Sequence, residues 1–365
     1  MEKTYRILVI NAGSTSTKVA YYENEKNICE KSLDIDRSLI AGMKEIFEQY
    51  GLRRATIEFF LEEIGVKKES LDLIVSRGCG GGDQKGGAYM VNEALCEHCR
   101  HYEIPHASSL GPVIAFDMGN ELGIPAFIYD SDGVNEFNDL AVLSGLKEFP
   151  IAPGSHTLNA KAAARVAAAR LGGAYQDFNL VVCHLGGGSS TSIHSGGKLI
   201  DSTSDAYAAE RTGGMPFLAM TGFVAGCFSG KYTQNEVMKL FMGKGGLMSY
   251  LGTSDLREVE RRIEAGDEEA QYYFDGMVYQ QSKDIAAMAT VVDMNVDAIV
   301  LTGGMAHSQR LTDAIRKRVE KIAPVILVPG SREMDSLAGG ALRVVRGEEG
   351  YHLFGEEETE EHYYG

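Results

Sequence analysis

The sequence predicts an α/β protein built from two domains of related design. Stretches that read as buried strands alternate with stretches that read as helices along the chain. One unusual arrangement also occurs twice, at 6–22 and at 179–201: an apolar strand enters a turn rich in Gly, Ser and Thr, and a second strand returns from it. A repeat of this kind indicates two domains of shared ancestry that face each other across a cleft.

The first domain is expected over 1–152. After the opening hairpin, helical patterns follow at 38–50 and 54–64, and the apolar strand "LDLIVSR" then runs into a glycine-rich loop. The helix "PVIAFDMGNELG" and the strand "IPAFIYD" complete this half of the chain.

The second domain is expected over 153–335 and contains the second hairpin. A further strand leads into glycines in "DAIVLTGGMAHS" (297–308), and a helix and the strand "PVILVP" follow it. A helix at 336–350 can pack back on the first domain, and 351–365 reads as an acidic tail.

Composition argues against several classes of function. The chain has 365 residues and a formal net charge of -16, which argues against binding to nucleic acid, because phosphate backbones attract basic surfaces. No apolar run reaches the roughly 20 residues that span a bilayer, so no membrane partner is expected. The start "MEKTYRILVI" enters a strand without the apolar core of a signal peptide, which favours the cytoplasm.

The six cysteines are irregularly spaced, as expected for reduced thiols. In "CEHCRH", Cys96 and Cys99 lie beside two histidines and leave open a zinc-dependent protein, but structural zinc needs a second ligand pair at a defined distance. The stretch 92–102 also reads as a helix on which the two cysteines share one face. We favour the helix.

The glycine-rich turns do not match the standard nucleotide motifs. The nearest approach to the Walker pattern, "AGCFSGKY", has Ala225 for the first glycine and Tyr232 for the last hydroxyl, and it lies in an apolar helical stretch. No clean G-x-G-x-x-G opens a helix, which removes the main support for a Rossmann fold. The hairpin turns instead offer backbone N–H groups and hydroxyls, which form concave anion sites, and Lys18 adds a point charge to the first.

The two hairpins and the "LTGGMA" turn together resemble the actin-like ATPase superfamily, in which two ribonuclease-H-like domains hold ATP. Within it, "NAGSTSTK", "HLGGGSS", "ERTGGMP" and "SDLREVE" resemble the carboxylic acid kinases, the acetate and butyrate kinase family. "KGGAYMVNEAL", "GKGGLMSYLGTSD" and "LAGGALRVVRGEE" resemble its branch of butyrate and branched-chain fatty acid kinases. The resemblance covers roughly 6–349. It implies reversible, ATP-dependent phosphorylation of a short-chain carboxylate to an acyl phosphate, with ATP, ADP and Mg²⁺, in a homodimer or higher homo-oligomer.

The resemblance also assigns catalytic roles. Arg77 is expected to orient the carboxylate of the acid, Arg211 to stabilise the phosphoryl group in transfer, and His156 to donate a hydrogen bond to that group. Arginine suits the first two positions because its planar fork grips two oxygens at once. No general base is needed, since a carboxylate is already ionised at pH 7.

Further positions follow from the same motifs. Asp130 and Glu333 match the metal-linked acids of the family, Asp130 among the catalytic residues and Glu333 as a Mg²⁺ ligand beside Asn11. Cys79 and Ser155 are expected to contact the acid together with the first catalytic arginine. The residues expected to bind the nucleotide are Asn11, Ser14, Ser16, Lys18, His184, Gly186, Gly187, Gly188, Asp255, Arg257, Gly303 and Gly304.

Two departures from the family concern the acid. Relatives carry an aromatic residue before the histidine that corresponds to His156, whereas this chain has Ser155, which leaves a larger or more polar cavity. The loop "RGCGGGDQKGG" adds Asp83 and Gln84 where relatives are more apolar. An acetate or propionate kinase therefore stays open as an alternative. A module that hydrolyses ATP to change shape also stays open, although retention of both arginines and the histidine favours the kinase.

Overall fold

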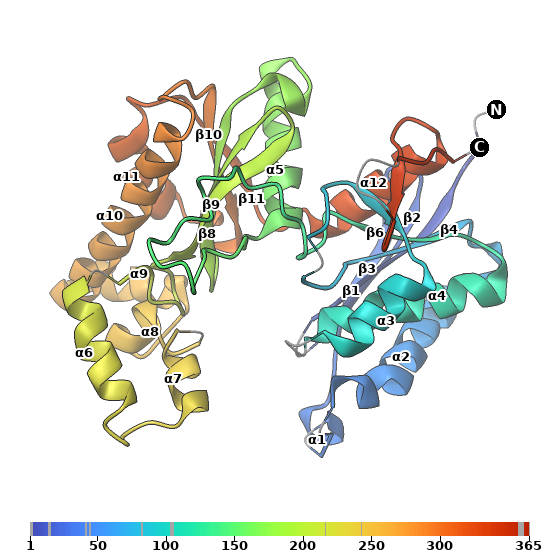
Figure 1. Cartoon of the computed structure of the whole chain (residues 1–365), viewed down its shortest axis with the longest axis horizontal. Helices are drawn as coiled ribbons and strands as arrows, with labels where there is room; N and C mark the ends of the chain where they lie inside the picture. The colour runs from blue at the N-terminus through green and yellow to red at the C-terminus, as the bar shows by residue number, and fades with distance from the viewer. Residues whose placement is uncertain are drawn as a thin grey trace. The chain divides into compact units, whose positions relative to one another are not determined.

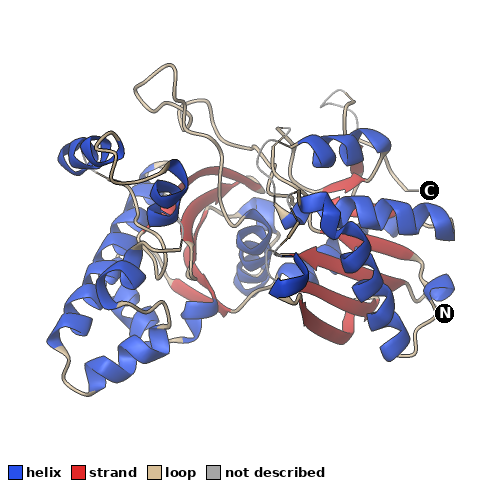
Figure 2. Cartoon of the chain, turned by 90° about the horizontal axis from the view of Figure 1, so that it is seen from below, coloured by secondary structure: helices blue, strands red, loops and turns tan. Residues whose placement is uncertain are grey.

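The computed structural model of the chain describes residues 3–13, 16–40, 42–43, 45–81, 83–102, 106–215, 217–241, 243–356 and 361–364. Ser14, one of the expected nucleotide contacts, lies outside these residues. The chain divides into two compact units, Met1–Asn135 with Arg332–Gly365 (unit 1) and Glu136–Ser331 (unit 2). Each unit is built around one mixed β-sheet with helices packed against it (Figure 1, Figure 2).

Unit 1 holds a seven-stranded sheet, among the residues described, in the order β12-β5-β6-β4-β1-β2-β3. β1 pairs antiparallel with β2 and parallel with β4, so the expected opening hairpin is present. The strands are β1 Arg6–Ala12, β2 Ser16–Glu23, β3 Lys26–Asp34, β4 Leu73–Ser76, β5 Ala88–Met90, β6 Ala126–Tyr129 and β12 Tyr351–Leu353.

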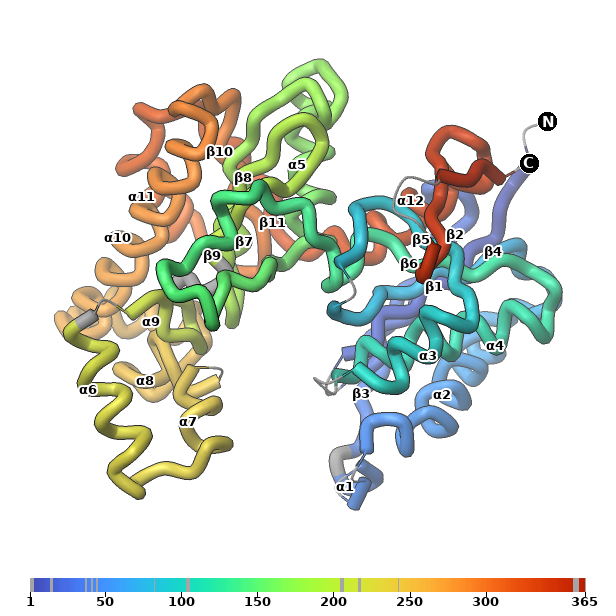
Figure 3. The backbone as a smooth tube through the Cα atoms, viewed as in Figure 1, coloured from blue at the N-terminus to red at the C-terminus, as the bar shows by residue number. Residues whose placement is uncertain are grey.

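Helices cover both faces of this sheet. α2 packs on β2 and α4 packs on β1, β4 and β6, whereas α12 packs on β1, β4, β5 and β6 from the opposite face (Figure 3). The helices are α1 Arg37–Ile40, α2 Tyr50–Glu63, α3 Glu93–His101, α4 Leu110–Leu122 and α12 Glu333–Val345, with 3-10 turns η1 Ile46–Gln49, η2 Lys68–Ser70 and η3 Ala107–Ser109. The single helix expected at 38–50 is wrong, because α1 and η1 are separate short elements with Gly42, a poor helix former, between them.

Unit 2 holds a five-stranded sheet in its described part, in the order β11-β10-β7-β8-β9. β7 pairs antiparallel with β8 and parallel with β10. The strands are β7 Leu180–His184, β8 Ser189–Ser195, β9 Lys198–Ala206, β10 Ala298–Gly303 and β11 Val325–Pro329.

One face of this second sheet is covered by α5 and the other by α10. The alanine-rich sequence of α5 lets it pack closely on Leu180, Val182 and Val300, whereas Val181 and Ile299 face the α10 side, as strand alternation requires. The helices are α5 Thr157–Leu171, α6 Phe217–Cys227, α7 Gln234–Phe241, α8 Gly246–Leu251, α9 Leu256–Glu264, α10 Glu268–Thr290 and α11 Gln309–Val319, with 3-10 turns η4 Tyr175–Asp177 and η5 Gly304–His307.

The two units share one connectivity. In unit 1 the strands run β3-β2-β1-β4-β6, and in unit 2 they run β9-β8-β7-β10-β11, with a hairpin first and parallel strands after it in both. The sequence expectation of two α/β domains of related design is therefore confirmed.

A buried ion pair fixes the segment that enters unit 2. Lys161 on α5 is almost fully buried, and its Nζ lies 2.9 Å from both carboxylate oxygens of Glu136. Oε2 of Glu136 also accepts a hydrogen bond from the N–H of Leu199 at the start of β9 (2.8 Å). The entering segment is thus anchored to the sheet on which the second hairpin lies.

Among the helices of the described residues, none combines the length and the apolar character needed to span a bilayer.

Candidate active site

In unit 1, the ends of β1 and β4 bring expected site residues to one edge of the sheet. Nδ2 of Asn11 on β1 donates to Oε2 of Glu333, at the start of α12, over 2.7 Å. Lys18 on β2 lies directly opposite Asn11 in the antiparallel register, so the two side chains share one face. Arg77 follows β4, and its N–H donates to the carbonyl of Ile10 (2.9 Å). Ligands of open α/β sheets bind beyond such carboxyl ends of parallel strands.

The guanidinium of Arg77 is held by an acid that the sequence analysis did not single out. Its Nη2 donates to both Oδ1 and Oδ2 of Asp132, at 2.9 Å each. Burial lowers the pKa of Arg77, but the carboxylates of Asp132 and Glu333 outweigh burial and raise it, so the side chain stays charged. Its Nε is buried and has no hydrogen-bond partner among the residues described. This free donor suits a further carboxylate oxygen.

Cys79 and Asp130, two other expected site residues of unit 1, are buried. The Sγ of Cys79 contacts the Sγ of Cys99 at 2.9 Å. Oδ1 of Asp130 accepts from the N–H of Gly87 (2.9 Å). Asp130 also has a φ of 42°, which is uncommon for a residue other than glycine, so it holds a strained turn at the end of β6. These contacts serve the local structure, and a catalytic role for Asp130 stays a prediction.

The "CEHC" stretch lies on α3, which confirms the helix expected there. Cys96 and Cys99 are buried on one face of α3, and Nε2 of His98 lies 3.0 Å from the carbonyl oxygen of Gly80. Within the described ranges, no group of three or more His, Cys, Asp or Glu side chains could hold a metal ion.

In unit 2, two histidines stack beside the second hairpin. The rings of His156, at the start of α5, and His184, at the end of β7, are 4.0 Å apart and tilted by only 2°. Burial lowers the pKa of His184 to about 4, so its ring is neutral at pH 7. Its Nδ1 lies 2.9 Å from Nδ2 of Asn159, an amide donor, and we assign the ring proton to Nε2 on that ground.

Ser190, at the start of β8, links the histidine pair to the hairpin. Its Oγ lies 2.9 Å from Nδ1 of His156 and accepts from the N–H of the same residue (3.3 Å). The hydroxyl of Ser155 lies 3.3 Å from it. The hydroxyls that follow the glycines in "GGGSS" were the available signal for Ser190. Ser190 therefore fixes the orientation of the His156 ring beside the second hairpin.

Arg211 lies directly against the turn of the second hairpin. A Cβ added at Gly188 would be 2.8 Å from Nε of Arg211, and the N–H of Glu210 donates to the carbonyl of Gly187 (2.9 Å). The glycine turn and the "ERTGG" loop therefore form one unit, and the absence of a side chain at Gly188 is what lets the guanidinium approach.

Two glycines at the end of β10 have different structural roles. Gly303 has a φ of 89°, and a Cβ there would lie 2.4 Å from the carbonyl oxygen of Leu185, so this position packs β10 against the second hairpin. Gly304 has open space where a Cβ would be, so a ligand can approach its backbone closely.

Asp255 and Arg257, the expected adenosine contacts, pair with each other at the exposed start of α9. The guanidinium of Arg257 donates to both oxygens of Asp255, over 2.9 and 2.8 Å, and this lowers the pKa of the carboxyl to about 2. Further along α9, Glu260 accepts a hydrogen bond from the hydroxyl of Ser308, which follows η5. α9 and the segment after η5, the two elements expected to hold the nucleoside, are therefore joined by a hydrogen bond. Taken together, the expected site residues form two groups, one in each unit.

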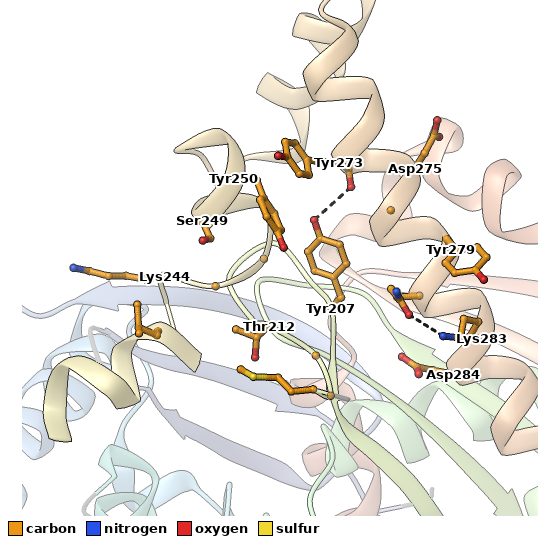
Figure 4. A pocket seen from close by; sticks show the side chains of 18 of the residues that line it. Tyr207, Thr212, Lys244, Ser249, Tyr250, Tyr273, Asp275, Tyr279, Lys283 and Asp284 are labelled. Carbon is orange, nitrogen blue, oxygen red and sulfur yellow. Dashed lines mark hydrogen bonds between the residues drawn. The ribbon is translucent and has the colours of Figure 1, made fainter. Parts of the chain in front are cut away.

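Unit 2 also contains a pocket of about 880 Å³ that the sequence analysis did not predict. Figure 4 shows tyrosine rings crowding its wall, with Tyr207 pointing between Tyr250 and α10. The rings of Tyr250 and Tyr273 stack at 4.2 Å, and burial raises the pKa of Asp284 to about 6. The pocket contains none of the expected catalytic residues, so its size does not make it the site of phosphoryl transfer.

Comparison with solved structures defines the class of fold. Acetate kinase from Porphyromonas gingivalis superposes with a TM-score of 0.76 at 18% identity, over 92% of this chain and 99% of that chain. A propionate kinase from Francisella tularensis subsp. tularensis SCHU S4 gives a TM-score of 0.72 at 17% identity, over 92% and 98%. Their shared architecture confirms the expected actin-like ATPase fold of two related α/β domains.

Sequence relatives define the family. The chain is 40% identical over 356 residues to the "Probable butyrate kinase 2" of Caldanaerobacter subterraneus subsp. tengcongensis, which covers 96% of this chain and 100% of that protein. Residues 147–323 match the model of the acetokinase family. The chain therefore belongs to the acetokinase family, and the expected class of enzyme, a kinase that phosphorylates a carboxyl group, is confirmed.

Gly188→Ala tests the contact between the glycine turn and Arg211. The added methyl group should displace the guanidinium and lower kcat by about tenfold to a hundredfold, since a misplacement of about 1 Å has such an effect. Gly226→Ala, at a position with open space, is the matched control and should leave kcat unchanged. Steady-state kinetics and a thermal melt of each variant are the measurements. A normal kcat for Gly188→Ala would show that the observed position of Arg211 is irrelevant to catalysis.

Proposed function

We propose that the protein transfers the γ-phosphoryl group of ATP to a short-chain carboxylate such as butyrate or isobutyrate, giving an acyl phosphate and ADP. The observation that carries this proposal is the grouping of His156, His184 and Arg211 around one glycine turn of unit 2. The relative named a probable butyrate kinase supports an acid of about this size. The reaction is reversible in this proposal, because an acyl phosphate is itself a strong phosphoryl donor.

The chemistry requires cations, because two anions must approach each other. Arg77 is proposed to hold the carboxylate of the acid, using the Nε–H that has no partner among the described residues. Arg211 and His156 are proposed to stabilise the phosphoryl group as it moves between oxygens. The neutral ring of His184 can donate from Nε2 to a phosphate oxygen without adding a charge that must be neutralised. Catalysis then consists of positioning and electrostatics.

The nucleotide is proposed to use the two hairpins and the turn after β10. Ser16 and Lys18 come from the first hairpin, and the turn of the second offers backbone N–H groups to the phosphates. Gly304 supports close approach of the nucleoside, and Asp255 and Arg257 at the start of α9 are proposed to supply polar contacts. The hydroxyl of Ser14 belongs to the same proposal.

Mg²⁺ fits the residues of unit 1. Asn11 and Glu333 lie in hydrogen-bond contact and together offer one amide oxygen and one carboxylate, the small protein share that Mg²⁺ takes when phosphates and water complete its shell. When bound, Mg²⁺ supplies positive charge to the phosphate oxygens. The role of the two residues is to hold that charge beside the first hairpin.

The proposed compartment is the cytoplasm, and the proposed assembly is a homo-oligomer. All six cysteines are free, as a reducing compartment requires. Leu218 and Phe228, at and just after α6, are 82% and 89% exposed, which supports a partner surface there. Light scattering measures the mass in solution, and 39.6 kDa would argue for a monomer.

Replacing the two arginines separates their proposed roles. Arg211→Ala should lower kcat by about 10²–10³ with a modest change in the KM of the acid, because its partner charge develops in the transition state. Arg77→Ala should chiefly raise the KM of the acid, because the carboxylate already engages it in the ground state. Lysine at either position should rescue only in part, since it lacks the planar fork. Full activity of both alanine variants, measured with butyrate, isobutyrate, valerate and acetate, would contradict the proposal.

Asp132 should weaken binding of the acid. Its carboxylate occupies the guanidinium of Arg77, and a second carboxylate placed there is repelled by it. Asp132→Asn keeps the shape and removes the charge, so the KM of the acid should fall by about tenfold, the equivalent of about 1.4 kcal/mol, with little change in kcat. Asp313→Asn removes the same charge from a surface ion pair of unit 2 and serves as the control. A rise in KM for Asp132→Asn would instead show that this acid orients Arg77.

A further inference from the structure

Arg53 on α2 is a fully buried arginine whose hydrogen-bond acceptors among the described residues are all neutral. Its Nε and Nη2 donate to Oε1 of Gln49, over 3.0 and 2.8 Å. Its Nη1 donates to Oγ1 of Thr17 (3.0 Å) and to the carbonyl of Ser16 (3.3 Å). The residue is 0% exposed, and none of these acceptors carries a charge.

A buried guanidinium without a counter-ion is costly. Removing a charge from water disfavours the folded state by several kcal/mol unless an opposite charge compensates, and an apolar side chain of similar volume is often as stable. Burial lowers the pKa of Arg53 to about 10, which still leaves it charged at neutral pH. Packing alone therefore does not explain an arginine at this position, and the charge calls for an anion.

The hydrogen bonds of Arg53 point to the first hairpin. The carbonyl of Ser16 also accepts from the N–H of Gly13 (2.8 Å), the bond that closes the turn. Thr17 and Lys18 are consecutive on β2, so their side chains lie on opposite faces of the sheet. Arg53 thus holds the hairpin from the α2 side, while Lys18 and Asn11 lie on the other face.

A second cation, Arg77, lies in the same part of unit 1, because both arginines act on His106. Burial lowers the pKa of His106, and the positive charges of Arg77 and Arg53 lower it further, against the opposing effect of Asp132. Asp132 is already paired with Arg77. Arg77 therefore has a carboxylate partner, whereas the acceptors of Arg53 are all neutral.

We propose that Arg53 is a positioning residue for the phosphates of the nucleotide. It fixes the β1–β2 hairpin from behind through Ser16 and Thr17, and a bound phosphate group serves as its missing counter-ion. The inference rests on the proposed function, because it takes the first hairpin as a phosphate site. Arg53 lies on α2, outside the sequence motif of the first hairpin, so the proposal adds a residue to the phosphate site.

The test compares binding of ATP and of adenosine to the full chain by calorimetry. Arg53→Met and Arg53→Lys should weaken ATP by about tenfold to a hundredfold, the range for hydrogen bonds to charged groups, with the lysine variant less affected. Adenosine has no phosphate, so its affinity should not change. Thr17→Val, which keeps the shape and removes the acceptor, should weaken ATP in the same selective way and covers the case in which Arg53→Met does not fold.

Arg54 is the matched control. It is the next residue on α2, but it pairs with Glu58 and Glu121 near the surface, so Arg54→Met should leave ATP and adenosine affinities unchanged. Equal loss of both ligands in the Arg53 variants, or no loss of ATP, would overturn the proposal. No carboxylic acid is used in this experiment. A wild-type protein that binds ATP but phosphorylates no acid would contradict the proposed function. The comparison of ATP and adenosine binding would still test the role of Arg53.

Discussion

Both units depend on a tight hairpin at the end of a central strand. β1 and β7 each pair with an antiparallel neighbour on one side and a parallel strand on the other. Turns of this kind, rich in glycine and hydroxyl residues, form concave sites that suit anions. The rest of each unit fixes that turn: Gly303 packs against Leu185 beside the second hairpin, and Arg53 bonds the first from α2.

The arginines of the two units differ in how far their charges are paired with carboxylates. Arg54 on α2 is paired with two glutamates. Arg53, one residue earlier, is bonded to neutral oxygens, and Arg77 has a buried Nε without a partner among the residues described, although Asp132 holds its Nη2. Arg211 lies against the glycine turn of the second hairpin. We propose that these cations attract the phosphates and the carboxylate of the acid.

Much of the fold could be predicted from the sequence, because its signals are local. The apolar strands and the Gly/Ser turns predict both hairpins. The helix expected at 92–102 matches α3, which begins after the capping residue Asn92. The repeated hairpin then predicts the shared strand order of the two units. The helix expected at 38–50 failed where a glycine interrupts a weak pattern and short-range preference decides little.

The site residues that the sequence did not predict are defined by contacts between residues far apart in the chain. Asp132 reaches Arg77 across 55 positions of the chain, and no local pattern marks that pair. Arg53 and Arg54 are adjacent and identical in type, so only the packing of α2 distinguishes the fully buried residue from the partly buried one. Ser190 had a signal in its motif, but its bond to His156 joins strand to helix and needed the fold.

The central claim is that a carboxylate, rather than water, accepts the phosphoryl group. Purified protein with ATP and Mg²⁺ is incubated with each acid in turn, and hydroxylamine traps any acyl phosphate as a coloured hydroxamate while ADP is measured in parallel. The account predicts hydroxamate and ADP in equal amounts with four-carbon acids, and almost no ADP when acid is absent. Release of ADP at the same rate with and without acid, with no hydroxamate, would contradict it.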